Sequence, residues 1–346
     1  MRLIAILLFA FTVPTIVVSQ GSQAASKDSP SQRLQLTSTA RVPLSGSLVG
    51  KARCDEDNNI YVRFMDAETA HKHNGISTIP IKKIRPDGTV AATFRVTDAA
   101  PEIVGKDFSV TSGGRVYQAA WTPDGTVYVV GYSNDGSFKS KVRLEADFFT
   151  PYQIAVFASG EFLLSGTQGR FDRVPFTGVF APDGHLIKKI YEPEDEGSRQ
   201  KAELGDPNFR SDYTNAGNTF VWYGDAVAGS DGNVYLLRSI SPALLYVISS
   251  KGEVLRKLRI ESSGAGLVAR TMRAGPGKLA ISFLERYSTK GITEVVDLQG
   301  NLLTNIFSDN ETTIYPGHPG CYSSGAFVFI SGDANHDMHL YKAEPK

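Results

Sequence analysis

The chain has 346 residues, of which 41% are hydrophobic and 21% charged. That composition supports a packed core and excludes wholesale disorder, and the length allows one large all-β domain or two ordinary ones. The 36 basic residues are matched by 36 acidic residues, so no net charge attracts nucleic acid or an anionic membrane, and we expect neither as a partner.

The N-terminus has the pattern of a targeting segment. Arg2 is followed by the apolar run Leu3–Val18 and then by small residues, which is typical of a secretory signal peptide. We expect a signal peptide over residues 1–19, with cleavage as late as residue 24 also allowed, and a polar tether over residues 20–32. A retained membrane anchor is the alternative. No other apolar run approaches the ~18 residues of a membrane span, so we predict an exported soluble protein, periplasmic or extracellular.

A small polar turn followed by an apolar strand recurs along the chain, on average about fifty residues apart. The copies are Asp57–Phe64, Pro123–Tyr132, Ala158–Gly166, Ser230–Ser239, Gly275–Leu284 and Ser323–Gly332. Asp-Gly and related pairs favour tight β-hairpins. The period is close to that of a propeller blade.

A second turn follows most of the first ones, at Asp87-Gly88, Asp183-Gly184, Lys251-Gly252 and Gln299-Gly300. Two hairpins per repeat make a four-stranded antiparallel blade. In the second repeat, Asp135-Gly136 follows so soon that we expect a short outer edge. The last repeat lacks an outer strand, which Leu34–Leu44 can supply and so close the ring. We predict an all-β, six-bladed β-propeller over residues 33–346. A seven-bladed ring and a pair of β-sandwiches are the alternatives.

The stretch Asp231–Leu236 (DGNVYL) and the hairpin after it resemble NHL-type and related six-bladed propellers of exported proteins. The resemblance spans most of residues 45–343 and is specific for the fold. It implies a superfamily that contains binding modules, lactonases and lyases, and it does not choose among them.

The long segments of the repeats are expected to meet on one rim of the ring. They are Asp66–Pro80, Thr97–Arg115, Glu192–Asn218 and Asp309–Gly320, and long loops on a rigid scaffold often carry binding residues. Seven positions before each first turn stands a polar residue: Lys51, Gln118, Gln153, Asp225, Arg270 and His318. We predict that these six side chains converge near the ring axis and bind a ligand. The alternative is that they merely line a water-filled channel.

Cys54 and Cys321 occupy equivalent positions on the first strands of the first and last repeats. Ring closure would make those strands neighbours, and a disulfide there could contribute ~4 kcal/mol. Equivalent strands can also lie beyond the ~7 Å Cα separation that a disulfide allows. A bond and two separate buried thiols therefore both remain open.

Catalytic and metal signatures are weak. Neither His71 and His73 nor the group His336, Asp337 and His339 has a zinc-like spacing, and Asn310 begins a glycosylation sequon. Propeller lactonases of the gluconolactonase type hold a divalent cation through one Glu and several Asn or Asp residues, and among the six positions above Asp225 is the only carboxylate. The leading hypothesis is therefore a non-enzymatic module without a cofactor that binds a small polar molecule, glycan or peptide. The alternative is a cation-dependent hydrolase, lactonase or lyase that uses the same channel.

Overall fold

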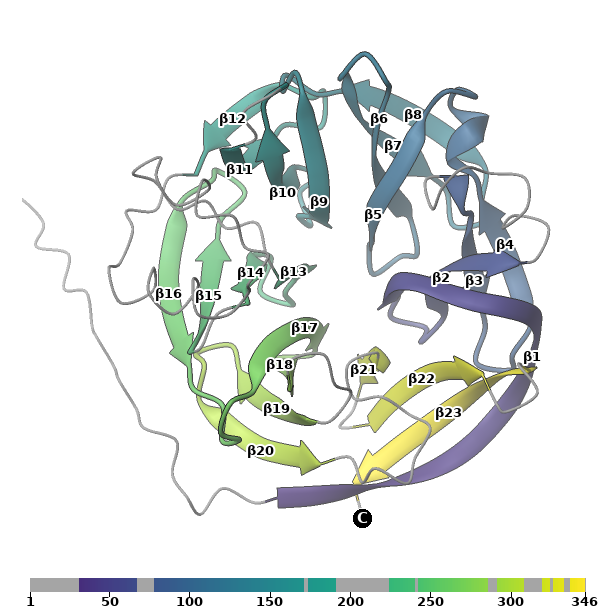
Figure 1. The fold of residues 1–346 in the computed structure, drawn as a ribbon, viewed down its shortest axis with the longest axis vertical. Helices are drawn as coiled ribbons and strands as arrows, with labels where there is room; N and C mark the ends of the chain where they lie inside the picture. The colour runs from purple at the N-terminus through teal and green to yellow at the C-terminus, as the bar shows by residue number, and fades with distance from the viewer. Residues whose placement is uncertain are drawn as a thin grey trace, which may run out of the picture.

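The computed structural model describes residues 31–66, 78–170, 174–190, 224–239, 242–285, 291–307, 319–323, 326–332 and 337–345. These residues form β-strands arranged around a ring (Figure 1), with a short 3-10 turn at Val96–Asp98. Within these ranges there is no α-helix, and so no helix long and apolar enough to cross a membrane. The chain is all-β, as the sequence predicted.

Three of the sheets contain four antiparallel strands each, in chain order. The first consists of β5 (Val104–Val110), β6 (Val116–Trp121), β7 (Val127–Tyr132) and β8 (Phe138–Arg143). The second consists of β9 (Phe149–Val156), β10 (Phe162–Gln168), β11 (Val174–Phe180) and β12 (Leu186–Lys189). The third consists of β13 (Gly224–Ala228), β14 (Val234–Arg238), β15 (Ala243–Ile248) and β16 (Val254–Ile260).

The remaining strands are connected through the long strand β1 (Ser31–Cys54). They are β2 (Ile60–Asp66), β3 (Ile81–Ile84), β4 (Val90–Phe94), β17 (Val268–Gly275), β18 (Lys278–Leu284), β19 (Gly291–Asp297), β20 (Leu302–Phe307), β21 (Pro319–Ser323), β22 (Ala326–Gly332) and β23 (Asp337–Pro345). β1 begins at Ser31, two residues before the expected domain start.

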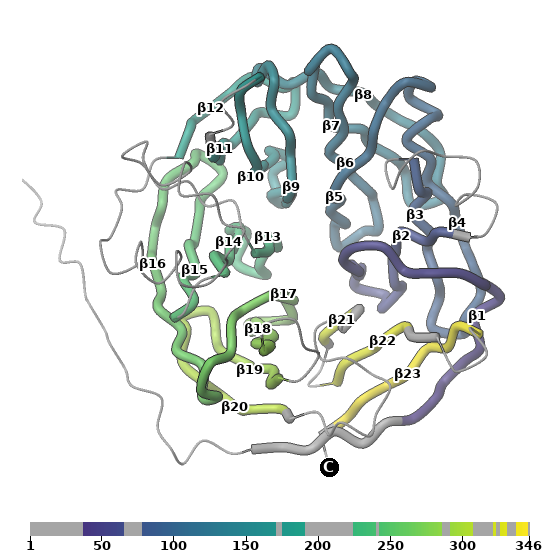
Figure 2. The backbone as a smooth tube through the Cα atoms, viewed as in Figure 1, coloured from purple at the N-terminus to yellow at the C-terminus, as the bar shows by residue number. Residues whose placement is uncertain are grey.

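β1 joins the two ends of the chain. Residues 31–33 pair in parallel with β20, and residues 34–45 pair antiparallel with β23. Residues 46–54 turn inward and pair with β2 (Figure 2). The segment that the sequence analysis chose as the closing strand therefore does pair with the last strand of the chain. This pairing covers an edge of β23 that would otherwise be exposed.

The innermost strands follow one another around the axis. β1 lies beside β5, β5 beside β9, β9 beside β13, β13 beside β17, β17 beside β21, and β21 beside β1 again (Figure 1). The core lies between consecutive sheets rather than in the centre. One hydrophobic cluster, for example, joins Tyr235, Leu245 and Val247 of the third sheet to Met272 and Phe283 of the next. Side chains on both faces of each sheet are therefore buried by a neighbouring sheet.

The outer turn of one sheet packs against the outermost strand of the sheet before it. Gly136 and Gly184 adopt a positive φ of 91° and 96°, and a side chain at either position would overlap a carbonyl oxygen, of Thr93 or of Arg143 respectively. Glu145 N also donates to Gly184 O at 3.0 Å. Only glycine satisfies both the turn and this contact, so the second turn of the repeat fixes each sheet to its predecessor.

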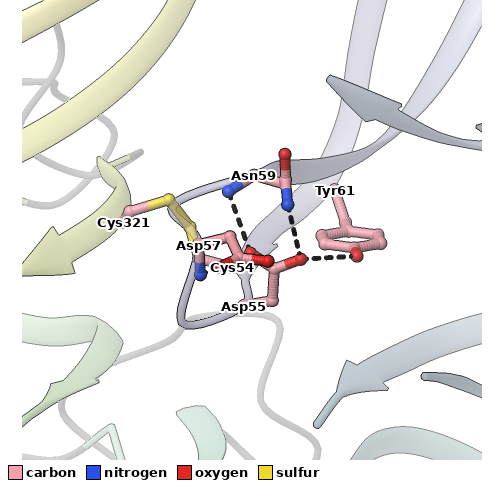
Figure 3. The surroundings of a disulfide bond; sticks show 6 residues. All are labelled: Cys54, Asp55, Asp57, Asn59, Tyr61 and Cys321. Carbon is pink, nitrogen blue, oxygen red and sulfur yellow. Dashed lines mark hydrogen bonds between the residues drawn. A yellow bond between two sulfur atoms is a disulfide. The ribbon is translucent and has the colours of Figure 1, made fainter. Parts of the chain in front are cut away.

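The ends of the ring are also joined covalently. Cys54 of β1 and Cys321 of β21 form a disulfide, with their Cα atoms 5.5 Å apart (Figure 3). The turn after Cys54 is held by Asp55, which accepts hydrogen bonds from Asn59 Nδ2 and Tyr61 Oη at 2.8 Å each. Of the two possibilities that the sequence left open, the structure contains the bond.

Two expectations about the second repeat are wrong. Its outer edge is a full strand, β8, rather than a short one. The turn at Asp124-Gly125 joins β6 to β7, whereas the turn that follows the innermost strand β5 is Thr111–Arg115. The segment Thr97–Arg115 is therefore not a loop, because it contains β5. The repeat was misaligned because Asp124-Gly125 has the stronger turn signal, while the inner turn has the sequence Ser112-Gly113-Gly114.

Candidate functional site

The six predicted site residues do not all reach the axis. Lys51, Gln153 and Asp225 lie on the innermost strands β1, β9 and β13. Gln118 is 1% exposed but lies on β6, opposite Phe108, so its predicted place on an innermost strand is wrong. With the turn alignment corrected, Asp107 on β5 takes that place.

Arg270 lies on the innermost strand β17, but it is skipped in the pairing register between Ala269 and Thr271 and is exposed. His318 falls outside the described residues, as do His71, His73, His336, Asn310, Glu192–Asn218 and most of the segments Asp66–Pro80 and Asp309–Gly320.

Register irregularities recur where the innermost strands begin. They occur between Val49 and Arg53, Gly105 and Phe108, Pro151 and Gln153, Ala269 and Thr271, and Pro319 and Cys321. A β-bulge bends a strand and re-aims its side chains. We call the end of the ring where the innermost strands begin the start rim, and these bulges decide which side chains turn from it toward the axis.

Asp225 is the centre of a buried charge cluster, which we call the axial cluster and define as Lys51, Arg53, Asp107, Asp225 and Arg273. Asp225 is 0% exposed. Its Oδ1 accepts from Arg53 Nη2 at 2.8 Å and from Lys51 Nζ at 3.0 Å. Its Oδ2 accepts from Arg273 Nη1 at 3.1 Å.

Two backbone amides complete the coordination of this carboxylate. Ala226 N donates to Oδ1 at 2.9 Å, and Met272 N donates to Oδ2 at 3.1 Å. Asp225 therefore ties β13 to β1 and to β17 at the level of the bulges. Five donors on two oxygens leave this carboxylate little capacity for any further partner.

Asp107 extends the cluster to β5, the innermost strand that lies beside β1. Its Oδ2 lies 3.4 Å from Arg53 Nη2 and accepts from Ile154 N of β9 at 3.3 Å. Arg53 also donates through Nε to Phe108 O at 3.3 Å. Arg53 thus bridges two carboxylates that come from different sheets.

Asp225, Arg53 and Arg273 remain ionised at neutral pH. Burial alone would raise the pKa of Asp225, but the charges of Arg53, Lys51 and Arg273 outweigh it and hold that pKa well below its usual range. Burial lowers the pKa of Arg273 to about 10, with the charge of Arg53 acting in the same direction and Asp225 opposing both. For Arg53, burial is outweighed by Asp225 and Asp107, and its pKa is raised.

Lys51 is the member of the axial cluster that is partly exposed to solvent. Its side chain is 22% exposed while Nζ is held by Asp225 and by Gly224 O at 2.7 Å. Arg53, Arg273 and Asp225 are at least 90% buried beneath it. The buried part of the axial cluster is mostly cationic, and Lys51 lies at its solvent-exposed edge.

Sequence reasoning missed Arg53, Arg273 and Asp107. Each is a charged residue within a strand whose neighbours in sequence are largely apolar or buried. Because burying an unpaired charge is costly, such residues signal a partner elsewhere in the fold. Counting seven residues back from the first turn leads to Arg270 on β17, three residues before Arg273, which contacts Asp225.

Metal chemistry has little support in the donor set. Among the described residues, no group of three or more His, Cys, Asp or Glu side chains could hold a metal ion. Asp225 itself faces three cations, which repel a divalent ion. The described part of the axial cluster therefore does not fit the carboxylate-rich site of a cation-dependent lactonase.

A surface pocket of about 590 Å³ lies between the sheets β5–β8 and β9–β12. It is lined by Arg143, Leu144, Glu145, Ala146, Asp147, Gln168, Asp183, Gly184 and His185. Glu145 Oε2 lies 2.9 Å from His185 Nδ1, but both side chains are more than 60% exposed. Without a buried polar group directed into it, this pocket is a weaker candidate than the axial cluster.

Comparison with known proteins defines the fold. No protein-family model matches the chain, and no curated protein matches it. A gluconolactonase from Xanthomonas campestris aligns with a TM-score of 0.51 at 12% identity, over 93% of this chain and 96% of that one. A protein of unknown function from Bacteroides thetaiotaomicron VPI-5482 aligns with a TM-score of 0.51 at 12% identity, over 91% and 76%.

A virginiamycin B lyase from Staphylococcus aureus aligns with a TM-score of 0.48 at 15% identity, over 90% of this chain and 99% of that one. At such identities, similarity of structure shows the fold and not the activity. The sheets, their arrangement around a common axis and the two matching structures with a TM-score of 0.51 together establish that this chain has the β-propeller fold.

Proposed function

We propose that this chain is an exported six-bladed β-propeller that binds a small polar ligand, or the end of a glycan or peptide, at the start rim. Six innermost strands that return to the first one support a ring of six blades. The proposed module includes residues 33–346, preceded by the signal peptide and tether. Amino-terminal sequencing of the exported protein tests the cleavage between residues 19 and 24.

The observation that carries the binding role is the axial cluster. Residues from sheets far apart in the sequence place five charged groups around one axis, with Lys51 at the solvent edge. Folding gains little from such a cluster, because desolvating ions offsets most of their attraction. Convergent polar groups on a rigid scaffold are what a small-molecule site requires.

The alternative is a cation-dependent hydrolase, lactonase or lyase. The similarity of fold to a gluconolactonase supports considering it, whereas the three cations around Asp225 disfavour a metal ion there. Elemental analysis of the purified protein and lactone-hydrolysis assays before and after chelation separate the two functions. A stoichiometric divalent metal with chelator-sensitive activity would overturn the binding module.

The binding role is tested on the side chains that reach solvent. Small molecules that copurify with the protein are released by denaturation, identified by mass spectrometry and titrated back by calorimetry. We expect Lys51→Met and Arg270→Ala to weaken binding, with Arg41→Gln, an exposed arginine on the outer half of β1, as the control. Unchanged affinity in both test variants contradicts a site at the start rim.

A further inference from the structure

The surface pocket between the sheets β5–β8 and β9–β12 is separate from the axial cluster. Its volume of about 590 Å³ lies within the range of small-molecule sites. It is formed by the end of β8, the connection that follows β8, the end of β10 and the turn between β11 and β12. No residue of the axial cluster lines it, so a ligand in this pocket uses a different set of side chains.

The connection after β8 gives the pocket an apolar floor and polar walls. Leu144 and Ala146 line the pocket, are 1% and 3% exposed and pack into the core between the two sheets. Arg143, Glu145 and Asp147 alternate with them and are exposed, because the alternation of a strand continues beyond β8. A sugar ring has the complementary surface, with hydroxyl groups around its edge and C–H groups on its face.

The three carboxylates of the pocket each have an oxygen available for a ligand. Asp147 Oδ1 lies 3.4 Å from Arg143 Nη2. His185 N donates to Asp183 Oδ1 at 3.1 Å, and His185 Nδ1 lies 2.9 Å from Glu145 Oε2. Within the described residues, the second oxygen of each carboxylate makes no hydrogen bond. An ionised carboxylate only accepts hydrogen bonds, so the pocket suits a ligand that is rich in O–H donors.

The backbone beside the pocket is held in an unusual conformation. Phe148, which follows Asp147, has a left-handed backbone with a φ of 51°. Its N donates to Gly125 O and its O accepts from Gly169 N, at 3.0 Å each. This conformation is rare and costly for a bulky residue, and residues of this kind gather at functional sites. The two hydrogen bonds fix the backbone next to Asp147 and next to Gln168, which also lines the pocket.

The corresponding junction between two other sheets has no such lining. Where the sheet β13–β16 meets β17–β20, side-chain atoms of Leu258 and Ile260 lie 3.3 and 3.2 Å from the position of a Cβ at Gly300. Asn301, which corresponds to His185, donates back into its own turn at 2.8 Å. Two sheets can therefore pack at this place through apolar side chains alone. Exposed charged pairs contribute little to stability, so packing does not account for the polar lining of the pocket.

We propose that this pocket binds a neutral saccharide unit as a second site, independent of the one at the start rim. The carboxylates of Glu145, Asp147 and Asp183 accept hydrogen bonds from its hydroxyl groups. Arg143 and His185 donate to its oxygens. The lining contains three carboxylates but only one arginine and one histidine, so a sugar that carries a carboxylate is repelled.

The first test measures which saccharides the full chain binds. Labelled protein is applied to an array of immobilised neutral oligosaccharides, together with uronate-containing and amino-sugar oligosaccharides. We expect saturable binding to at least one neutral oligosaccharide and binding at least about fivefold weaker to its uronate-containing counterpart. Failure to bind any neutral oligosaccharide overturns the proposal, as does binding to amino sugars alone.

The second test changes two side chains of the pocket. Asp147→Ala combined with His185→Ala removes two groups that bond the sugar and should weaken the affinity for the bound oligosaccharide about tenfold or more. Glu261→Ala is the matched control, because it removes a carboxylate that is 59% exposed and directly follows the outermost strand β16. The control should bind as the wild type does, and circular dichroism checks that both variants are folded. Equal affinity of the double variant and the wild type overturns the proposal.

The third test locates the saccharide on the unmodified protein and separates this site from the start rim. In NMR spectra of the isotope-labelled full chain, the oligosaccharide should shift the amide signals of Glu145, Ala146 and Gly184, and Lys51→Met should leave its affinity unchanged. Shifts confined to Lys51 and Arg270, with affinity lost in Lys51→Met, place the saccharide at the start rim; they support the proposed function and overturn this inference. Shifts confined to the pocket support this inference whether or not a start-rim ligand is found.

Discussion

Replacing Asp225 with asparagine perturbs the axial cluster at its centre while preserving side-chain volume. The carboxylate accepts five hydrogen bonds, three of them from cations. An asparagine retains one oxygen and turns an N–H₂ group toward the donors on the other side, for example Met272 N and Arg273 Nη1. Two bonds accepted by the carboxylate are lost, one of them from a cation, and three cations lose the anion that separated them.

The size of the effect follows from these contacts. A hydrogen bond to a charged group such as the Asp225 carboxylate contributes about 1.5–3 kcal/mol. Removing one partner from a buried ion pair costs about 3–5 kcal/mol. We therefore expect Asp225→Asn to lower the free energy of unfolding by about 4 kcal/mol. At about 2–4 °C per kcal/mol for a domain of this size, the unfolding midpoint should fall by about 8–16 °C.

Circular dichroism with thermal and urea denaturation measures this change, at neutral pH and in a buffer with a non-coordinating anion. The matched control is Asp337→Asn, which removes an ion pair with Arg41 in which both side chains are at least 38% exposed. An exposed pair contributes about 0–1 kcal/mol. If Asp225→Asn destabilises the protein no more than this control, the carboxylate does not organise the centre of the ring and our account of the cluster is wrong.

Three further predictions concern pH, the disulfide and the turn glycines. Because the pKa of Asp225 is lowered in the folded protein, its contribution to stability is complete above the unfolded pKa of about 4 and declines as the pH falls further. The difference in unfolding free energy between wild type and Asp225→Asn, measured in urea from pH 3 to pH 8, should therefore narrow only at the acid end. A difference that stays constant over this range contradicts the prediction. Reduction of the disulfide should lower the thermal unfolding midpoint of the wild type but not that of a Cys54→Ser, Cys321→Ser double variant. The loss of unfolding free energy has an upper limit of about 5 kcal/mol for closing a loop of this length. Equal sensitivity of the two proteins to reductant counts against the bond. Gly184→Ala should lower the free energy of unfolding by about 3 kcal/mol or more, because it combines a left-handed backbone with overlap of a carbonyl oxygen on β8. Gly232→Ala, with a φ of +83° and open space around it, should cost only about 1 kcal/mol. Similar losses for the two variants in urea denaturation would show that the contact between the sheets is unimportant.

The local pattern of the sequence was sufficient for the architecture. Hairpin turns are determined by a few adjacent residues such as Asp231-Gly232, and apolar alternation identifies the strands around them. The closing strand could be inferred because the last repeat lacked an outer strand, and β1 does pair with β23. Lys51 and Asp225 could be placed on innermost strands by counting back from a turn, and they are in contact.

The same counting failed wherever geometry departs from a regular ladder. In the second repeat a strong Asp-Gly signal marks the wrong turn, so Gln118 was selected in place of Asp107. On β17 Arg270 lies at a bulge and is exposed, whereas Arg273, three residues later, contacts Asp225. A single inserted residue moves side chains to the other face of a strand, and nothing in the local pattern announces it.

The sequence by itself determined the repeated hairpins, the closing strand and the two cysteines brought together by closure, because each depends on residues close in the chain or on one missing partner. Only the tertiary structure decided the site. Arg53 and Asp225 are 172 positions apart, and their pairing depends on how many sheets separate their strands and on the bulge that aims each side chain. The energy of an ion pair depends on the distance between the two charges, and these side chains come close together only when the ring has closed.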